Sequence, residues 1–167
     1  KHIPLKLKII VPTIMLIILI GVGIFLTSTK IMTKSLTNEI QDQLIATSNL
    51  GYALCDQFYP GEWNVRDSAL YKGEKPILNN NELTDFIKQQ TGCEATIFYN
   101  STRVSTSVID DTGKRAIGTT ASHEITERVI KQGQEFIGEA KVLNKPHEAK
   151  YIPIKDKEGN TVGMFFV

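Results

Sequence analysis

The stretch 96–122, TIFYNSTRVSTSVIDDTGKRAIGTTAS, carries one cation and two hydroxyls at alternate positions, Arg103, Ser105 and Ser107. Because successive side chains of a strand point to opposite faces, these three are expected on one face and their apolar neighbours on the other. An enclosed arginine needs a carboxylate or a similar acceptor, supplied by the chain or by a ligand. The alternative interpretation is an exposed arginine on a solvated strand.

The spacing of the other reactive residues does not indicate a catalytic site. The histidines form no HxxxH or HxH pair, and neither cysteine has a partner at CxxC spacing. Asp110 and Asp111 begin DDTG, which resembles the Asp-Thr-Gly tripeptide of aspartic proteases. A single copy in a charged run is better explained by turn geometry, which favours Asp and Gly. We therefore expect no enzyme activity, no metal site and no cofactor.

Length and charge also limit the possible functions. The 167 residues suffice for one compact domain with an appendage. The 19 basic residues are balanced by 18 acidic ones, so the sequence does not indicate a basic surface that follows a phosphate backbone. A nucleic-acid partner is therefore not expected.

The residues 9–26, IIVPTIMLIILIGVGIFL, contain no charge and have the length that spans a bilayer. A signal peptide is the alternative, but no small-residue cleavage site follows this stretch. We predict a membrane-spanning helix over 9–29. The three lysines before it favour a cytoplasmic segment 1–8, which places the domain 30–167 outside the membrane.

A long amphipathic helix is predicted from Ser28 to Phe58, continuous with the membrane helix, because the stretch has no proline and its apolar residues recur at helical spacing. The first half can pair with a second copy of the chain, and the part from Leu50 to Phe58 is expected in the core. The apolar stripe consists of Leu36, Ile40, Leu44, Leu50, Leu54 and Phe58.

The rest of the chain predicts an α+β domain with a central antiparallel sheet of about five strands. Proline and glycine punctuate a loose hairpin or lid around Trp63 and Tyr71. NNELTDFIKQQTG predicts one short helix, and TASHEITERVIKQG a second, capped by Thr120 or Ser122. The expected strands are EATIFY, TRVSTSV, EFIGEAKVL, HEAKYIPI and NTVGMFFV.

Cys55 and Cys93 lie in the part of the chain that is expected outside the membrane. A disulfide is possible in that compartment, but two cysteines far apart in a domain with its own core do not form a disulfide framework. Two buried free thiols are the simpler interpretation.

Several motifs together resemble the single Cache sensor domain of bacterial membrane receptors, most of all methyl-accepting chemotaxis proteins. They are YPGEWNV, LYKGEKPI, the stretch 96–122, GQEFIGEA and YIPIKDKEGNTVGMFFV. The resemblance implies a PAS-like fold with the long helix on one side of the sheet and a small-molecule pocket on the other. It also implies that the chain continues from its last strand into a second membrane helix.

The resemblance also implies a set of ligand-binding residues. Arg103 would bind a carboxylate and Ser105 would donate a hydroxyl hydrogen bond. Further contacts are expected from Tyr151, His147 and Gly138 and, with the lid, from Trp63, Tyr71 and Tyr99. Tyr151 stands where citrate-type sensors carry a basic residue, so a small monocarboxylate or an amphipathic ligand is at least as compatible as a multiply charged one. The two lid aromatics and Tyr99 also fit plain packing, and His147 also fits an exposed strand position.

These features predict the ligand-sensing domain of a bacterial transmembrane chemoreceptor. The expected partners are a small anion, membrane lipid, a second copy of the chain, and cytoplasmic signalling proteins reached through a missing C-terminal part. The expected location is the cell membrane, with the domain periplasmic or extracellular. A histidine kinase or diguanylate cyclase would use the same kind of domain. A pilin-like subunit and a membrane-anchored hydrolase are the alternatives from other classes.

Overall fold

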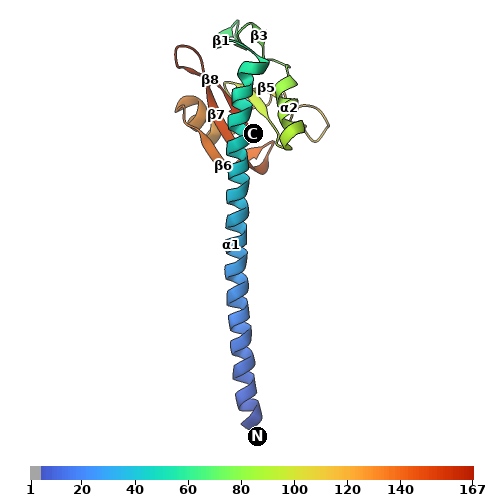
Figure 1. Cartoon of the computed structure of the whole chain (residues 1–167), viewed down its shortest axis with the longest axis vertical. Coiled ribbons are helices and arrows are strands. Elements are labelled where there is room, and N and C mark those ends of the chain that lie inside the picture. The colour runs from blue at the N-terminus through green and yellow to red at the C-terminus, as the bar shows by residue number, and fades with distance from the viewer. Residues whose placement is uncertain (1–4) are drawn as a thin grey trace. The chain divides into compact units, whose positions relative to one another are not determined.

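The computed structural model describes residues 5–167, so the first four residues of the expected cytoplasmic segment lie outside the described part (Figure 1). One helix, α1, runs from Leu5 to Phe58, as the sequence predicts. Its most apolar stretch has a mean hydropathy of 2.7 and is exposed, so by length and composition α1 could cross a membrane. The chain divides into two compact units after Glu39, and the second unit, Ile40–Val167, holds the sheet.

The predicted five-stranded antiparallel sheet is confirmed, with strand order β5-β4-β8-β7-β6. Its last strand in sequence therefore lies in its centre. The strands are β4 Thr96–Tyr99, β5 Thr102–Thr106, β6 Phe136–Val142, β7 Lys145–Lys155 and β8 Thr161–Phe166.

The first face of the sheet packs against α1 and against α2, which spans Glu82–Thr91 and ends at a left-handed Gly92 as predicted. We call the buried cluster here the first core. It contains Leu44, Cys55, Tyr59, Trp63, Leu70, Ile77, Leu83, Ile87, Ala95, Ile97, Val104, Ile154, Phe165 and Val167.

The buried face of α1 differs from the stripe that the sequence suggested. Leu50 is 55% exposed, so its prediction as a core residue is wrong. Small residues, Ser48 and Gly51, are buried instead. A Cβ at Gly51 would lie 2.7 Å from Cζ of Phe165. The helix therefore docks where its side chains are smallest, because only there can its backbone approach the aromatic ring.

The second face is covered by residues 107–133, which end in α3, His123–Ile125, and the π-helical turn η1, Thr126–Lys131. Ser122 caps α3 as predicted, because its Oγ accepts a hydrogen bond from the backbone N–H of Ile125. The buried cluster here is called the second core. It contains Phe98, Val108, Ala116, Ile125, Val129, Phe136, Ala140, Val142, Ala149, Tyr151, Met164 and Phe166.

The expected lid is a small antiparallel sheet of three strands, β1 Trp63–Arg66, β2 Ala69–Lys72 and β3 Lys75–Pro76. Its aromatic anchor, Trp63, belongs to the first core. The apolar residues of the lid pack together with those of α1 and α2 in the first core, so the lid lies on the first side of the sheet.

Candidate ligand-binding site

The position of Arg103 depends on a β-bulge between β4 and β5. Phe98 lies opposite Arg103, but Ile97 lies opposite Ser105, which leaves Val104 as an extra residue. A bulge of this kind shifts the alternation of side chains between the two faces. Arg103 therefore shares the second face with Phe98. The expectation that Arg103 and Ser105 share a face is wrong.

The two serines of this stretch bind the chain itself on the side of α2. The Ser105 hydroxyl donates to the backbone carbonyl of Asn80 at 2.8 Å. The Ser107 hydroxyl donates to Glu94 Oε2 at 2.5 Å and accepts from the backbone N–H of Ala95 at 2.9 Å. Both hydroxyls thus have structural partners, and neither is available beside the arginine.

Arg103 is only 1% exposed, and within the described part of the chain no carboxylate contacts it. Its Nη1 donates to the hydroxyl of Thr119 at 2.9 Å and to the carbonyl of Thr120 at 3.4 Å, while Nε has no hydrogen-bond partner. The guanidinium carbon lies 4.9 Å from the ring centroid of Phe98. Burial lowers the pKa of Arg103. A buried cation without a counter-charge is unfavourable, so this site is suited to receive an anion.

Tyr151, a predicted site residue, lies next to Arg103 in the second core. Its ring is 6.2 Å from that of Phe98, 6.1 Å from that of Phe136 and 4.9 Å from that of Phe166, centroid to centroid. Burial raises the pKa of Tyr151 to about 12, although the charge of Arg103 opposes this shift. The structure thus brings the arginine and the tyrosine together and surrounds them with aromatic rings.

Gly138 lies on β6, opposite Ala149 on β7. A Cβ built at Gly138 would meet only Cζ of Phe136, at 3.8 Å. The φ of +142° also favours glycine here. Two small residues thus lie side by side on two strands of the sheet, and Ala149 belongs to the second core.

His147 and Tyr99 lie away from the arginine. His147 is exposed, its Nδ1 is 2.9 Å from the carbonyl of Lys145, and it lines a pocket of about 200 Å³ whose lining includes Val142 and Phe166. Tyr99 packs against the first core.

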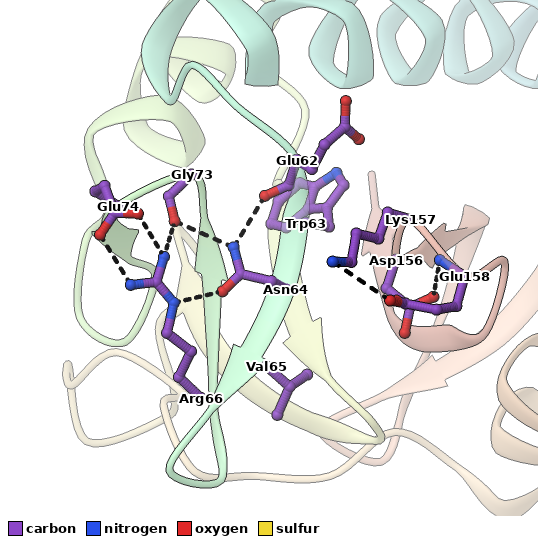
Figure 2. Close-up of a pocket in the computed structure, with 10 residues that line it drawn as sticks. All are labelled: Glu62, Trp63, Asn64, Val65, Arg66, Gly73, Glu74, Asp156, Lys157 and Glu158. Atoms are coloured by element: carbon purple, nitrogen blue, oxygen red, sulfur yellow. Dashed lines mark hydrogen bonds and ion pairs between the residues drawn. The ribbon is translucent and has the colours of Figure 1, made fainter.

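The lid forms a different pocket, of about 570 Å³, between β1, the turn at Gly73 and Glu74, and the turn after β7 (Figure 2). Trp63 lines it, and the Arg66 guanidinium binds both carboxylate oxygens of Glu74 at 2.8 and 2.9 Å. The same guanidinium stacks on Tyr71, 4.9 Å from the ring centroid. The guanidinium of Arg66 is thus already paired with Glu74 within the lid.

Three residues that contact the arginine or its neighbours were missed from the sequence: Phe98, Thr119 and Phe136. Phe136 belongs to the predicted strand EFIGEAKVL, two positions before Gly138, so the alternation of side chains could have placed it on the same face as Gly138. Thr119 follows a left-handed Gly118, a turn signal, but its contact with Arg103 depends on long-range pairing.

The cysteines are both free, with Cys55 buried and Cys93 partly exposed. Among the described residues, no group of three or more potential ligand side chains could hold a metal ion.

Comparison with known families gives one match. The model of the family described as single Cache domain 3 matches residues 75–167, which is more than half of the chain and includes Arg103, Tyr151, the five-stranded sheet and the whole second core. A search of curated proteins gives no match. The chain therefore belongs to the single Cache domain 3 family, whose domains are extracellular sensors of small molecules.

Proposed function

We propose that the domain senses a small carboxylate outside the membrane and that Arg103 is its anchor. The observation that carries this proposal is the buried guanidinium with an unpartnered Nε and, in the described part of the chain, no acidic partner. Arginine is well suited to this role because its planar fork matches a carboxylate with two parallel hydrogen bonds. Tyr151 and Gly138 complete the site as a polar tip and as open space.

The receptor type is part of the same proposal. The apolar stretch of α1 serves as the membrane anchor, and the sequence most resembles methyl-accepting chemotaxis proteins, so we propose a chemoreceptor that acts as a homodimer in the cell membrane. A histidine kinase or a diguanylate cyclase could receive the signal of such a domain equally well. Cytoplasmic signalling proteins would be its partners in each case.

Strand β8 offers a physical route for the signal. Met164 and Phe166 point into the second core beside Tyr151, whereas Phe165 points into the first core. The ring of Phe165 meets α1 at Gly51, where no space remains. A ligand that binds one position of β8 better than another would therefore bias the position of α1.

Binding can be tested on the full chain in lipid nanodiscs, by thermal unfolding in the presence of a panel of small carboxylates, including citrate. A ligand that binds only the folded state raises its melting temperature. We expect at least one carboxylate to stabilise the wild type and the control Arg66→Met, but not Arg103→Met. Arg66 is a suitable control because it is exposed and paired with Glu74.

Two results would contradict this function. A stabilising carboxylate that still acts on Arg103→Met binds elsewhere, and the pocket beside Trp63 would be the first place to search. If no carboxylate in the panel stabilises the wild type, Arg103 is not a carboxylate anchor.

A further inference from the structure

We propose that the Arg103 site accepts a ligand with one carboxylate and a short apolar body, and that it discriminates against dicarboxylates and amino acids. This inference rests on the proposed function, because the same arginine anchors the ligand. It concerns the ligand class, which the family assignment leaves open.

The guanidinium has one free edge. Its Nη1 is committed to Thr119 and Thr120, which also line a pocket of about 510 Å³. Its Nε has no partner, and Nη2 makes no hydrogen bond with the residues that the structure describes. The edge formed by Nε and Nη2 fits one carboxylate with two parallel hydrogen bonds.

Among the residues whose burial the structure describes, only one buried cation is available for a ligand. Of the three buried cations between residues 10 and 167, Lys72 binds Asp56 at 2.5 Å and Lys150 binds Glu135 at 2.6 Å. Arg103 is the third. A second carboxylate on the ligand would be buried without a partner, and leaving a charge unpaired in this way is costly.

Two exposed cations also lie near this face: Lys141 lines the same pocket as Thr119 and Thr120, and the guanidinium carbon of Arg128 lies 5.5 Å from the ring centroid of Phe136. Arg128 is exposed, so a dicarboxylate that reached it would gain a solvated contact of small value. Arg128 therefore provides the control that separates the two ligand classes.

The surroundings of the free edge suit an apolar body. Phe98, Phe136 and Tyr151 form an aromatic cluster next to the arginine, and beyond Phe136 and Tyr151 the same two strands carry the small residues Gly138 and Ala149 opposite each other. The ammonium group of an amino acid would lie close to the guanidinium, and like charges in a buried site repel strongly. A zwitterionic analogue should therefore bind less well than a simple fatty acid. An uncharged analogue should also bind less well, because it brings no negative charge to the guanidinium.

Four probes with four carbons each test this class directly: butyrate, succinate, 2-aminobutyrate and butyramide. Their affinities for the full chain in nanodiscs can be measured by calorimetry, with empty nanodiscs as the control for partition into lipid. We expect butyrate to bind at least tenfold more tightly than each of the other three. Arg103→Met should abolish butyrate binding, and Arg128→Met should leave it unchanged.

The outcomes distinguish this inference from the proposed function. If succinate or citrate binds more tightly than butyrate and loses affinity in both Arg103→Met and Arg128→Met, the ligand class is wrong while Arg103 remains the anchor. If butyramide binds as well as butyrate, the site does not read the carboxylate charge and the inference is overturned. If no carboxylate depends on Arg103, the proposed function fails as well.

Discussion

Two cations are buried in the sensor domain in different ways. Lys72 is 4% exposed and lies 5.4 Å above the ring of Trp63, and Arg103 is 1% exposed and lies 4.9 Å above the ring of Phe98. Lys72 is bound by the carboxylate of Asp56 at 2.5 Å and by the carbonyl of Gly61. Within the part of the chain that the structure describes, Arg103 has as hydrogen-bond partners only the hydroxyl of Thr119 and the backbone carbonyl of Thr120.

The difference separates a structural cation from one available to a ligand. Lys72 joins the lid to the end of α1, so its partners are part of the fold. Arg103 contributes no ion pair to the fold, and its lost solvation is not repaid within the described residues. Groups that are kept at a cost in stability are typical of functional sites.

The two regions also differ in packing, and the largest expected effect tests this. Gly51→Leu would force a side chain into the ring of Phe165 and into Ile87, whose Cδ1 would lie 2.9 Å from the new Cβ. Overpacking of this kind lowers the free energy of unfolding by about 3 kcal/mol. Urea unfolding followed by the fluorescence of Trp63 measures it. Ala53→Leu, at an exposed position of the same helix, should change little. A tolerated Gly51→Leu would mean that α1 and β8 are not closely coupled.

The second test concerns the two cations themselves. Lys72→Met leaves the Gly61 carbonyl without its donor and should lower the free energy of unfolding by about 2 kcal/mol. Arg103→Met replaces an unpaired buried charge by an apolar chain of similar length, so the free energy of unfolding should stay equal or rise. The same urea titration compares both variants.

An equal loss in the two variants would break the comparison. Arg103 would then be a structural cation like Lys72, held by Thr119 and Thr120. Should Arg103→Met fail to fold, Arg103→Lys serves as the second variant. It keeps the positive charge but loses the planar guanidinium, so a loss of stability in Arg103→Lys would show that the hydrogen bonds to Thr119 and Thr120 support the fold.

The sequence predicts the repeated elements of this fold well. Alternation identified the five strands, and the helical spacing identified α1 and α2, with Gly92 ending the latter. These signals are local, since each depends on neighbours within a few residues. The placement of Arg103 and Tyr151 in one site followed from the resemblance, whereas the close approach of the two side chains was not predicted.

The bulge at Val104 could not be predicted in this way. The outer edge of β5 is shared by two distant segments: Val104 accepts a hydrogen bond from the N–H of Asn79, and the N–H of Arg103 donates to the carbonyl of Thr119. The bulge shifts the pairing of β5 by one residue, and this shift decides which face of the sheet each side chain of β5 takes. Such a shift depends on the whole sheet, and it removed Ser105 from the site. The pairing of Lys72 with Asp56 was missed for the same reason, because it joins α1 to the lid.

The smallest effect is a dependence on pH that distinguishes the two regions. Burial raises the pKa of Cys55, near Lys72, from 9.0 to about 12, and raises that of Tyr151, near Arg103, from 10.0 to about 12. The unfolded chain then loses each proton at a lower pH than the folded protein does. Stability should therefore be constant up to about pH 9 and decrease above it, because deprotonation favours the unfolded state.

The two groups contribute over different ranges of pH. Between pH 9 and 10 the thiol of Cys55 is the largest single contributor, and at about 1.4 kcal/mol per pH unit it lowers the free energy of unfolding by about 1 kcal/mol at pH 10. Tyr151 adds to the loss above pH 10, together with Tyr52 and Tyr59, whose pKa values burial also raises. Urea unfolding between pH 8 and 11 should show that Cys55→Ala reduces the decrease between pH 9 and 10 by about half or more, whereas Tyr151→Phe acts mainly above pH 10. A decrease between pH 9 and 10 that is unchanged in Cys55→Ala would show that the thiol does not titrate in this range.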